Sequence, residues 1–325
     1  MAAHVIMVAR VEEVLTSDVT VVLLNWRRAH DTIACLDSLA GLEGTKPRVI
    51  VCDNGSGDHS VALLEAYARE SSLDIRLRQT GANLGFAGGV NVGLREALLD
   101  PGLRYAWILN NDTQLHPQAL NALLQKMQAD PTIGICGSTL LYLEDPHKIQ
   151  AVGGCYNPWL GTTRHCLGHE TYSPERCRAF DEHALDYVVG ASMFVRREVV
   201  DTVGLMDERY FLYFEEIDWA YQMHIKRPDL RLAYAPDSLV YHAEGATTGG
   251  NDRDGKRYSY TSDFFMLTSR LKCTRKNFPA RLWSVQLSML LVMLNRIRRG
   301  HWASARLALH LCLGLSVQSL APVQQ

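Results

Sequence analysis

The sequence has 325 residues, of which 33 are Lys or Arg, 35 are Asp or Glu and 47% are hydrophobic. This composition excludes a disordered, collagen-like or disulfide-dense chain and fits one large domain or two. The formal net charge of −2 also argues against a polyanion-binding surface, provided that the charge is spread evenly along the chain.

The charge is in fact divided between two unlike regions. Residues 264–325 contain nine of the basic residues and no Asp or Glu, which leaves 24 basic and 35 acidic residues in the rest of the chain. The tail therefore carries a charge of +9 and the rest a charge of −11. A basic segment without acids predicts contact with an anionic surface, either lipid or nucleic acid.

The eight cysteines include no C-x-x-C pair, and several of them lie in apolar runs, where a thiol is a small core residue. A zinc site formed by Cys155, Cys166, His169 and Cys177 is the alternative, although this spacing fits no common zinc pattern. Charged residues interrupt the first apolar run, so we expect no signal peptide. The default expectation is a reduced, cytoplasmic protein.

Short apolar runs alternate with helical patterns through the first half of the chain. The expected strands are 19–25, 48–53, 74–79, 105–110 and 134–143, and the expected helices are 31–42, 58–70, 87–99 and 117–129. This alternation predicts an α/β fold with a mostly parallel, Rossmann-like sheet and helices on both faces. Ligands of such sheets bind beyond the carboxyl ends of the strands.

The second half is less regular. Residues 150–183 have turn signals and little periodicity, which predicts a hairpin or another excursion from the sheet. The expected elements that follow are strands at 187–195, 230–235 and 238–241 and helices at 198–203 and 214–225. The glycine-rich run from Ala243 to Asn251 predicts a mobile loop.

Two apolar stretches of the tail, 282–294 and 307–317, are too short to cross a hydrocarbon core of about 30 Å. Arg296, Arg299, Arg306 and His310 lie close to one helical stripe, which predicts a basic amphipathic helix in the plane of a membrane. A helix pair packed on the catalytic domain is the alternative.

Short polar side chains follow the expected strands. The runs DNGSGD at 53–58 and NLGFAGGVN at 83–91 suit hydrogen bonding to a nucleobase or a ribose. As isolated motifs they would be Asx turns or helix caps. Neither the P-loop nor the dinucleotide fingerprint is complete, which disfavours kinase-like and NAD-dependent enzymes.

Two residues at strand ends are candidate metal ligands. Asp112 follows the strand at 105–110 and suits Mg²⁺ or Mn²⁺, whose ligands are oxygens; the alternative is a cap for a helix beginning near Pro117. His242 follows the strand at 238–241, where a neutral imidazole binds a divalent metal or simply packs in the fold.

The densest cluster of acidic and aromatic residues is at 210–219. Glu215, Glu216 and Asp218 lie within four residues and are flanked by five aromatic residues. A carboxylate held beside apolar rings suits a general base that acts on a hydroxyl group. A negatively charged helix N-terminus is the alternative.

These motifs together resemble the inverting nucleotide-sugar glycosyltransferases of the GT-A fold, in particular the bacterial rhamnosyltransferase-like branch of glycosyltransferase family 2. The resemblance covers residues 18–250 and rests on the order of the motifs. They are VVLLNW at 21–26, DNGSGD, NLGFAGGVN, LNND at 109–112, GAS at 190–192, FEEIDW at 214–219 and His242.

The resemblance implies a role for each matching position. The nucleotide pocket would be lined by Asn25, Asp53, Asn54, Ser56, Asn83, Gly85 and Asn111, and the acceptor side by Gly190, Ala191, Ser192 and Trp219. Asp112 and His242 would hold Mg²⁺ or Mn²⁺, with Asn110 in the place of the first Asp of the D-x-D motif. Glu216 would be the base, with Glu215 and Asp218 beside it. Because Glu216 stands where the family usually has Asp, Glu215 stays open as the base.

The implied division of the chain has three parts: an N-terminal extension at 1–17, a GT-A catalytic domain at 18–258 and a basic helical segment at 259–325. Within the catalytic domain, 18–143 would bind the nucleotide and 144–258 the acceptor.

The implied reaction is single-displacement, inverting transfer of a sugar to a hydroxyl of a glycan or lipid-linked glycan in bacterial lipopolysaccharide-type synthesis. The first expected donor is dTDP-rhamnose, and a UDP-hexose or UDP-N-acetylhexosamine stays open. We expect a peripheral enzyme on the inner face of the cytoplasmic membrane, attached through 264–325, without nucleic acid; a homo-oligomer stays open. The alternatives from other classes are a non-catalytic nucleotide-sugar-binding protein and a nucleotidyltransferase.

Overall fold

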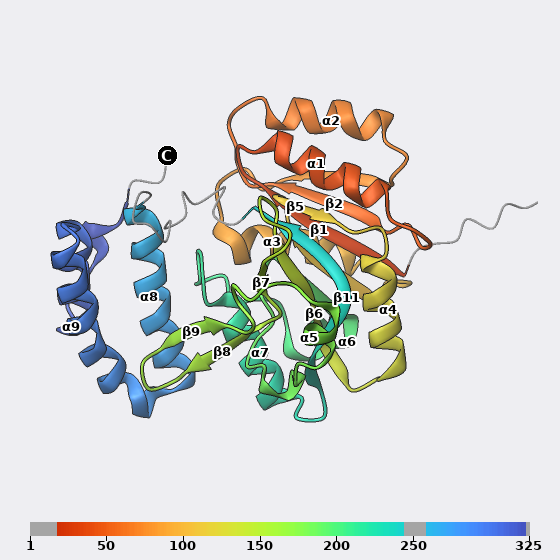
Figure 1. Cartoon of the computed structure of the whole chain (residues 1–325). Coiled ribbons are helices and arrows are strands. Elements are labelled where there is room, and N and C mark those ends of the chain that lie inside the picture. Colours follow the sequence, from red (N-terminus) through yellow and green to blue (C-terminus); the bar gives the residue numbers. More distant parts are fainter. Residues whose placement is uncertain (1–17, 244–257, 323–325) are drawn as a thin grey trace, which may run out of the picture.

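The computed structural model describes residues 18–243 and 258–322 (Figure 1). The strands are β1 (Val19–Asn25), β2 (Arg48–Asp53), β3 (Ile75–Gln79), β4 (Tyr105–Asn110), β5 (Thr113–Leu115), β6 (Ile133–Tyr142), β7 (Ile149–Ala151), β8 (Gly154–Asn157), β9 (Thr162–His165), β10 (Ser192–Arg196) and β11 (Arg231–His242). The helices are α1 (Ala29–Ala40), α2 (Ser60–Glu70), α3 (Gly85–Ala97), α4 (Ala119–Ala129), α5 (Pro174–Arg178), α6 (Arg197–Val203), α7 (Glu215–Lys226), α8 (Tyr260–Asn277), α9 (Leu282–Arg298) and α10 (Trp302–Cys312).

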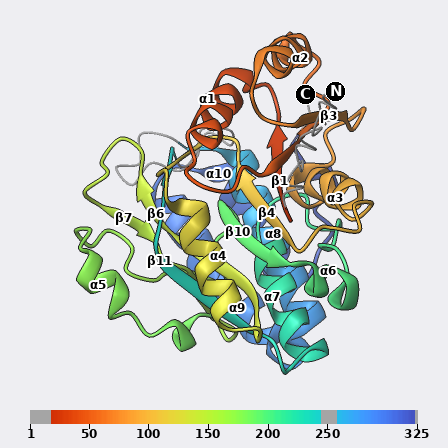
Figure 2. The ribbon, with the colours of Figure 1, turned by 90° about the vertical axis from the view of Figure 1, so that its right-hand side faces the viewer.

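A nine-stranded sheet organises the catalytic part of the chain. Its order is β3-β2-β1-β4-β10-β6-β11-β5, with β7 paired to β6 (Figure 2). Strands β1 to β4, β6 and β11 run in one direction, whereas β10, β5 and β7 run against their neighbours. The expected mostly parallel sheet is confirmed, and its carboxyl edge carries the polar motifs.

Helices cover both faces because the buried strands are apolar on both sides. In β1, Val21 and Leu23 pack in one cluster with Leu36 of α1, and Val22 packs on the other face with Leu94 of α3. The first cluster also includes α4, and the second includes α6 and α7. A strand buried on both faces has no polar alternation, which is why the sequence shows continuous apolar runs.

Two expected elements differ from the structure. The strand expected at 187–195 begins only at Ser192, because Tyr187 exchanges backbone hydrogen bonds with Gly154 and the Ser192 N–H turns back to the Val189 carbonyl. The two strands expected at 230–235 and 238–241 form the single strand β11, with a register shift that absorbs its Pro236.

The region at 150–183 forms the expected excursion. Its hairpin β8–β9 leaves the sheet and reaches the C-terminal helices, and α5 follows it (Figure 1). Of the expected mobile loop, all but Ala243 lies outside the described residues.

The C-terminal helices α8, α9 and α10 share an apolar cluster of their own that includes Leu271, Met289 and Leu307. The single in-plane basic stripe expected here is wrong. Gly300, with φ of +78°, separates α9 from α10, and Arg296 is paired with the buried Asp263 at 2.7 Å. No described helix is both long and apolar enough to span a membrane.

Candidate functional site

A closed hydrogen-bond network joins the ends of β1, β2 and β4. Asn25 Nδ2 donates to Asp53 Oδ1 at 2.8 Å and to Ser56 Oγ at 3.2 Å, while Asn25 Oδ1 accepts from Thr32 Oγ1 at 2.9 Å. Asn111 Nδ2 donates to the same Thr32 oxygen at 2.9 Å. All five side chains are buried, so the network fixes the relative position of three loops at the carboxyl edge of the sheet.

A second set of contacts joins the next loop to the segment before α7. Asn54 Nδ2 donates to Asn83 Oδ1 at 3.0 Å and to the Gly85 carbonyl at 3.1 Å. Gly85 has φ of +74°, and a Cβ atom there would lie 2.2 Å from the Phe211 carbonyl oxygen. That oxygen accepts from the Phe86 N–H at 2.7 Å. Only glycine allows this close approach, which links the nucleotide-side motif to the acidic motif.

Asp112 and His242 meet because β5, which follows Asp112, pairs with β11, which ends at His242. His242 Nε2 lies 3.1 Å from Asp112 Oδ1 and 3.2 Å from Asn110 Nδ2, and its Nδ1 lies 2.8 Å from Gln150 Oε1. Burial alone would raise the pKa of Asp112, but the hydrogen bond and charge of His242 hold it below its ordinary value. Strand β5 separates Asp112 from α4, so Asp112 does not cap that helix.

Glu215 and Glu216 begin α7 with incompletely paired carboxyl groups. The Oε2 atoms of both residues are buried and have no hydrogen-bond partner within the described part of the chain. A buried carboxyl oxygen without a donor is costly, and such groups are often kept for function.

The backbone that leads into α7 is strained. Tyr213 and Phe214 have φ values of 67° and 73°, in the left-handed region that side chains disfavour. Each such residue costs about 1 to 3 kcal/mol and persists only where its surroundings hold it. The Leu212 carbonyl accepts from Ser269 Oγ of α8 at 2.9 Å, and α3 holds the Phe211 carbonyl. Contacts from both sides therefore maintain the entry to α7.

Burial raises the pKa values of both members of the acidic pair, Glu215 and Glu216. It raises the pKa of Glu216 to about 7, and burial together with the charge of Glu216 raises the pKa of Glu215 well above its ordinary value. Burial and the charge of Glu216 also raise the pKa of Tyr187. At neutral pH Glu216 is thus divided between its protonated and ionised forms, which suits a group that accepts a proton from a hydroxyl.

Asp218 is occupied in packing rather than open to a ligand. It is 2% exposed, and its oxygens accept from Lys276 Nζ at 2.6 Å, Asn277 Nδ2 at 2.7 Å and Tyr210 OH at 3.3 Å. These bonds attach α8 to the N-terminal turn of α7.

The expected acceptor-side residues lie at different depths. Gly190 is partly exposed, whereas Ala191 is buried and Ser192 Oγ accepts from Trp107 Nε1 at 3.0 Å inside the sheet. Trp219 is 2% exposed and packs in the core against α6. Ser192 and Trp219 are therefore closed to an acceptor in this structure.

The 187–191 segment connects the two halves of the site. The Ala191 carbonyl accepts from the Asn110 N–H at 3.1 Å, next to Asp112, and Tyr187 at its other end lies within the electrostatic reach of Glu216. The segment therefore bonds at one end to the strand that precedes Asp112 and lies at the other end within the electrostatic reach of Glu216.

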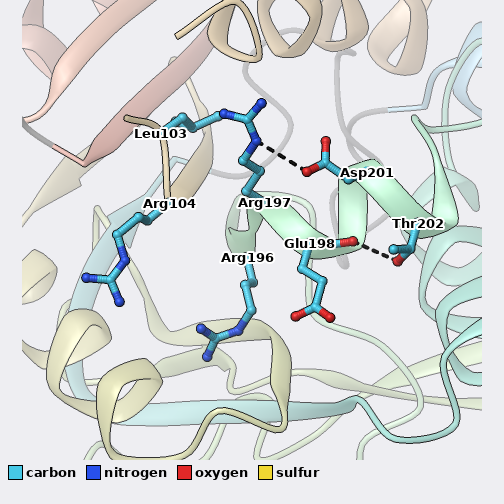
Figure 3. Close-up of a pocket in the computed structure, with 7 residues that line it drawn as sticks. All are labelled: Leu103, Arg104, Arg196, Arg197, Glu198, Asp201 and Thr202. Carbon is cyan, nitrogen blue, oxygen red and sulfur yellow. Dashed lines mark hydrogen bonds and ion pairs between the residues drawn. The ribbon is translucent and has the colours of Figure 1, made fainter. Parts of the chain in front are cut away.

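A separate pocket of about 420 Å³ lies at the opposite edge, where β4 begins (Figure 3). It is lined by Leu103, Arg104, Arg196, Arg197, Glu198, Asp201 and Thr202. Arg196 donates to the Ile133 carbonyl and Arg197 to the Asp100 carbonyl, so both guanidinium groups are already engaged. None of the polar motifs faces this pocket.

No group of three or more His, Cys, Asp and Glu side chains converges on a metal position within residues 18–243 and 258–322. The alternative zinc site is therefore wrong. Cys155 and Cys166 have sulfur atoms 3.2 Å apart, but His169 Nδ1 lies 3.0 Å from the Tyr142 hydroxyl.

Comparison with known proteins identifies the fold and the family. The family described as glycosyl transferase family 2 matches residues 20–204, more than half of the chain. The chain belongs to glycosyl transferase family 2. The resemblance drawn from motif order is confirmed, and this family 2 enzyme is a glycosyltransferase rather than a nucleotidyltransferase or a binding protein.

Two curated relatives of this family 2 enzyme are named as a rhamnosyltransferase and a hexosyltransferase. The N-acetylglucosaminyl-diphospho-decaprenol L-rhamnosyltransferase of Mycobacterium tuberculosis is 28% identical over 249 residues, which cover 68% of this chain and 75% of the relative. The low-salt glycan biosynthesis hexosyltransferase Agl10 of Haloferax volcanii is 23% identical over 219 residues, which cover 66% and 64%.

Solved structures share the fold of this family 2 enzyme. The mannosyltransferase PcManGT from Pyrobaculum calidifontis, in complex with GDP-Man and Mn²⁺, has a TM-score of 0.55 and 16% identity, over 93% of this chain and 77% of that one. GalNAc-T7 with UDP, GalNAc and Mn²⁺ has a TM-score of 0.58 and 14% identity, over 79% and 47%. The expected GT-A fold is confirmed.

Three residues of the site carry no sequence signal. Thr32 lies within a regular helical pattern, Gln150 in a turn-rich segment and Lys276 in the basic tail. Thr32 bonds to Asn111, Gln150 lies within hydrogen-bond distance of His242, and Lys276 bonds to Asp218, each across a long sequence separation. A pattern along the chain does not report such contacts, because the fold alone makes them.

Proposed function

We propose that this family 2 enzyme transfers L-rhamnose from dTDP-rhamnose to a hydroxyl of a lipid-linked glycan, with inversion at the anomeric carbon. The observation that carries the proposal is the Glu216 carboxyl, whose Oε2 atom is buried without a hydrogen-bond partner in the described part of the chain and whose pKa burial raises to about 7. The name of the Mycobacterium tuberculosis relative supports the sugar and the acceptor class. A UDP-hexose or UDP-N-acetylhexosamine donor with the same mechanism is the alternative.

The pair Asp112 and His242 fits a divalent cation. His242 Nε2 lies 3.1 Å from Asp112 Oδ1, and Gln150 Oε1 lies 2.8 Å from His242 Nδ1 and orients the ring. A cation bound between Nε2 and Oδ1 would replace the hydrogen bond that these two atoms share in this structure. Two ligands of one Mg²⁺ or Mn²⁺ ion are separated by about 3 Å when they are adjacent. The remaining ligand positions suit water and diphosphate oxygens. Mn²⁺ in the two structural neighbours supports the same cofactor class.

In the proposed reaction, different residues of the chain have different roles. Ionised Glu216 takes the proton from the acceptor hydroxyl as its oxygen attacks the anomeric carbon from the side opposite the diphosphate. The Asn25, Asp53 and Ser56 network keeps the nucleotide-side loops in position, which favours a reactive orientation of the donor. A cation bound by Asp112 and His242 would neutralise the charge that develops on the leaving diphosphate.

A donor panel tests the proposal. The full chain is incubated with Mn²⁺ and, in turn, dTDP-rhamnose, UDP-glucose, UDP-N-acetylglucosamine and GDP-mannose, and unfolding is followed by thermal shift. We expect dTDP-rhamnose at about a hundredfold its Kd to raise Tm by about 5 °C. Release of dTDP should then depend on a polyprenyl-diphospho-N-acetylglucosamine acceptor.

Two results would contradict parts of the proposal. Transfer from a UDP-sugar with no response to dTDP-rhamnose would overturn the donor but keep the mechanism. Acceptor-dependent turnover with retained anomeric configuration, measured by NMR of the product, would overturn the single displacement by Glu216.

A further inference from the structure

We propose that the outer face of α9, together with the tip of the β8–β9 hairpin, is a docking surface that inserts into the interface of an anionic lipid bilayer. This docking face consists of Trp283, Leu287, Leu291 and Leu294 of α9 and Trp159 and Leu160 of the hairpin. The inference goes beyond sugar transfer, because it concerns how the enzyme is held and stands whichever donor is used.

The apolar stripe of α9 is exposed on the side that faces away from the protein. Trp283, Leu287, Leu291 and Leu294 follow one another at helical spacing and are 63%, 56%, 67% and 57% exposed. The opposite side of the helix packs inward through residues such as Met289, which is fully buried. An amphipathic surface helix should show the reverse on its solvent side, with polar residues outward. A continuous exposed stripe of this kind marks an interaction site.

The hairpin tip extends the stripe with a segment from the acceptor half of the chain. The rings of Trp159 and Trp283 lie 6.5 Å apart edge to face, and Ser284 Oγ donates to the Trp159 carbonyl at 2.7 Å. Arg270 of α8 donates a hydrogen bond to the Leu160 carbonyl. Two segments distant in sequence therefore form one ordered face, which links the membrane contact to the catalytic domain (Figure 1).

Basic groups lie at both ends of the docking face. The Arg281 guanidinium lies 4.7 Å from the Trp159 ring centroid at one end, and Arg298 and Arg299 are exposed at the other. Residues 264–325 contain no acid that would oppose them. Tryptophan and arginine flanking leucine are the side chains that favour the boundary between lipid headgroups and acyl chains.

The positive charge of residues 264–325 favours lipid, rather than a second copy of this chain, as the partner that binds the docking face. Two copies that joined through α9 would bring two acid-free basic segments together, and this like-charge contact is unfavourable. Anionic headgroups instead complement the arginines. Because α9 has 17 residues and its inner side packs in the apolar cluster of the C-terminal helices, only its outer side is open to lipid. The helix therefore suits a position parallel to the membrane, inserted by about 5 to 10 Å.

Vesicle binding of the full chain tests the surface. The purified protein is mixed with vesicles of phosphatidylcholine and phosphatidylglycerol, or of phosphatidylcholine alone, and the bound fraction is measured by flotation. We expect binding to the anionic vesicles, a blue shift of tryptophan emission and release at high salt. The double variant Leu287→Glu/Leu291→Glu should bind at least about tenfold more weakly.

A matched control separates this face from general surface hydrophobicity. Leu99, which follows α3, and Ile225 of α7 are 78% and 54% exposed and lie outside the docking face. The variant Leu99→Glu/Ile225→Glu should therefore bind vesicles as the wild type does. Arg298→Ala/Arg299→Ala should lose about tenfold in affinity for anionic vesicles. Unchanged transfer to a water-soluble acceptor would show that each variant remains folded.

Three outcomes would overturn the proposal. The first is a wild-type protein that does not float with anionic vesicles. The second is equal binding by the wild type and by the Leu287 and Leu291 double variant. The third is a wild-type dimer in sedimentation velocity that this double variant converts to a monomer without any change in vesicle binding, since the face would then join two copies.

Discussion

Asp112 and Glu216 are both enclosed carboxyl groups of the proposed site, but the protein moves their pKa values in opposite directions. His242 lies against Asp112 and holds its pKa below the ordinary value despite burial. Glu216 Oε2 has no hydrogen-bond partner among residues 18–243 and 258–322, and burial raises the pKa of Glu216 to about 7. The nucleotide side therefore keeps a permanent negative charge, whereas the acceptor side keeps a group that gains and loses a proton near neutral pH.

The difference extends to the surroundings of the two carboxyls. On the nucleotide side, Asn25, Asp53 and Thr32 satisfy one another in a closed network. On the acceptor side, strained backbone at Tyr213 and Phe214 leads directly into unpaired oxygens. The first region is hydrogen-bonded within itself, whereas in the second the Oε2 atoms of Glu215 and Glu216 have no partner among the described residues. Substitutions at Glu216, Asp112 and Glu215 test whether the two carboxyl environments differ in this way.

Glu216→Gln should have the largest effect. The variant keeps the shape of the side chain but removes the proton acceptor, so kcat should fall by about 10² to 10⁴ with little change in the donor KM. The wild-type kcat should rise with pH up to about 7 and then level off, because only ionised Glu216 accepts a proton. Steady-state assays across pH, with release of the nucleotide as readout, measure both quantities.

Glu198→Gln is the control for Glu216→Gln, because Glu198 pairs with Arg227 on the surface and lies outside the site. It should leave kcat unchanged. Near-wild-type turnover by Glu216→Gln would remove Glu216 as the base and direct attention to Glu215.

Asp112→Asn should have the next largest effect. Loss of the carboxylate charge should lower kcat/KM by about a hundredfold and raise the Mn²⁺ concentration needed for half-maximal rate. EDTA should abolish turnover by the wild type, and added Mn²⁺ should restore it. Full activity of Asp112→Asn in EDTA would show that the permanent charge on the nucleotide side has another purpose.

The sequence predicted those features that repeat along the chain. Continuous apolar runs identified β1, β2 and β4, and motif order identified the family. The strand expected from Tyr187 failed in its first part because its backbone partner, Gly154, is in the distant hairpin. An apolar pattern reports burial and not the identity of the partner strand.

For the side chains of the proposed site, too, the sequence indicated positions but not contact partners. The positions of Asp112 and Glu216 could be read from motifs, but their opposite environments could not. Those environments depend on His242, more than 100 residues from Asp112, and on the enclosure of Glu216 by the fold. Likewise, the charge of Asp218 gave no sign that Lys276 of α8 neutralises it.

Glu215→Gln should have the smallest effect, on stability rather than on rate. Because the pKa of Glu215 is raised in the folded protein, its contribution is fully present below the ordinary value of 4.5 and is lost as the pH rises toward the folded pKa. Glutamine lacks this loss, so the variant should match the wild-type Tm near pH 4.5 and exceed it at pH 8 by about 2 to 4 °C for each kcal/mol gained. Thermal unfolding of both proteins at the two pH values measures the difference. Equal Tm values at pH 8 would mean that Glu215 has a partner in solution, and the contrast between a paired nucleotide side and an unpaired acceptor side would then rest on Glu216 alone.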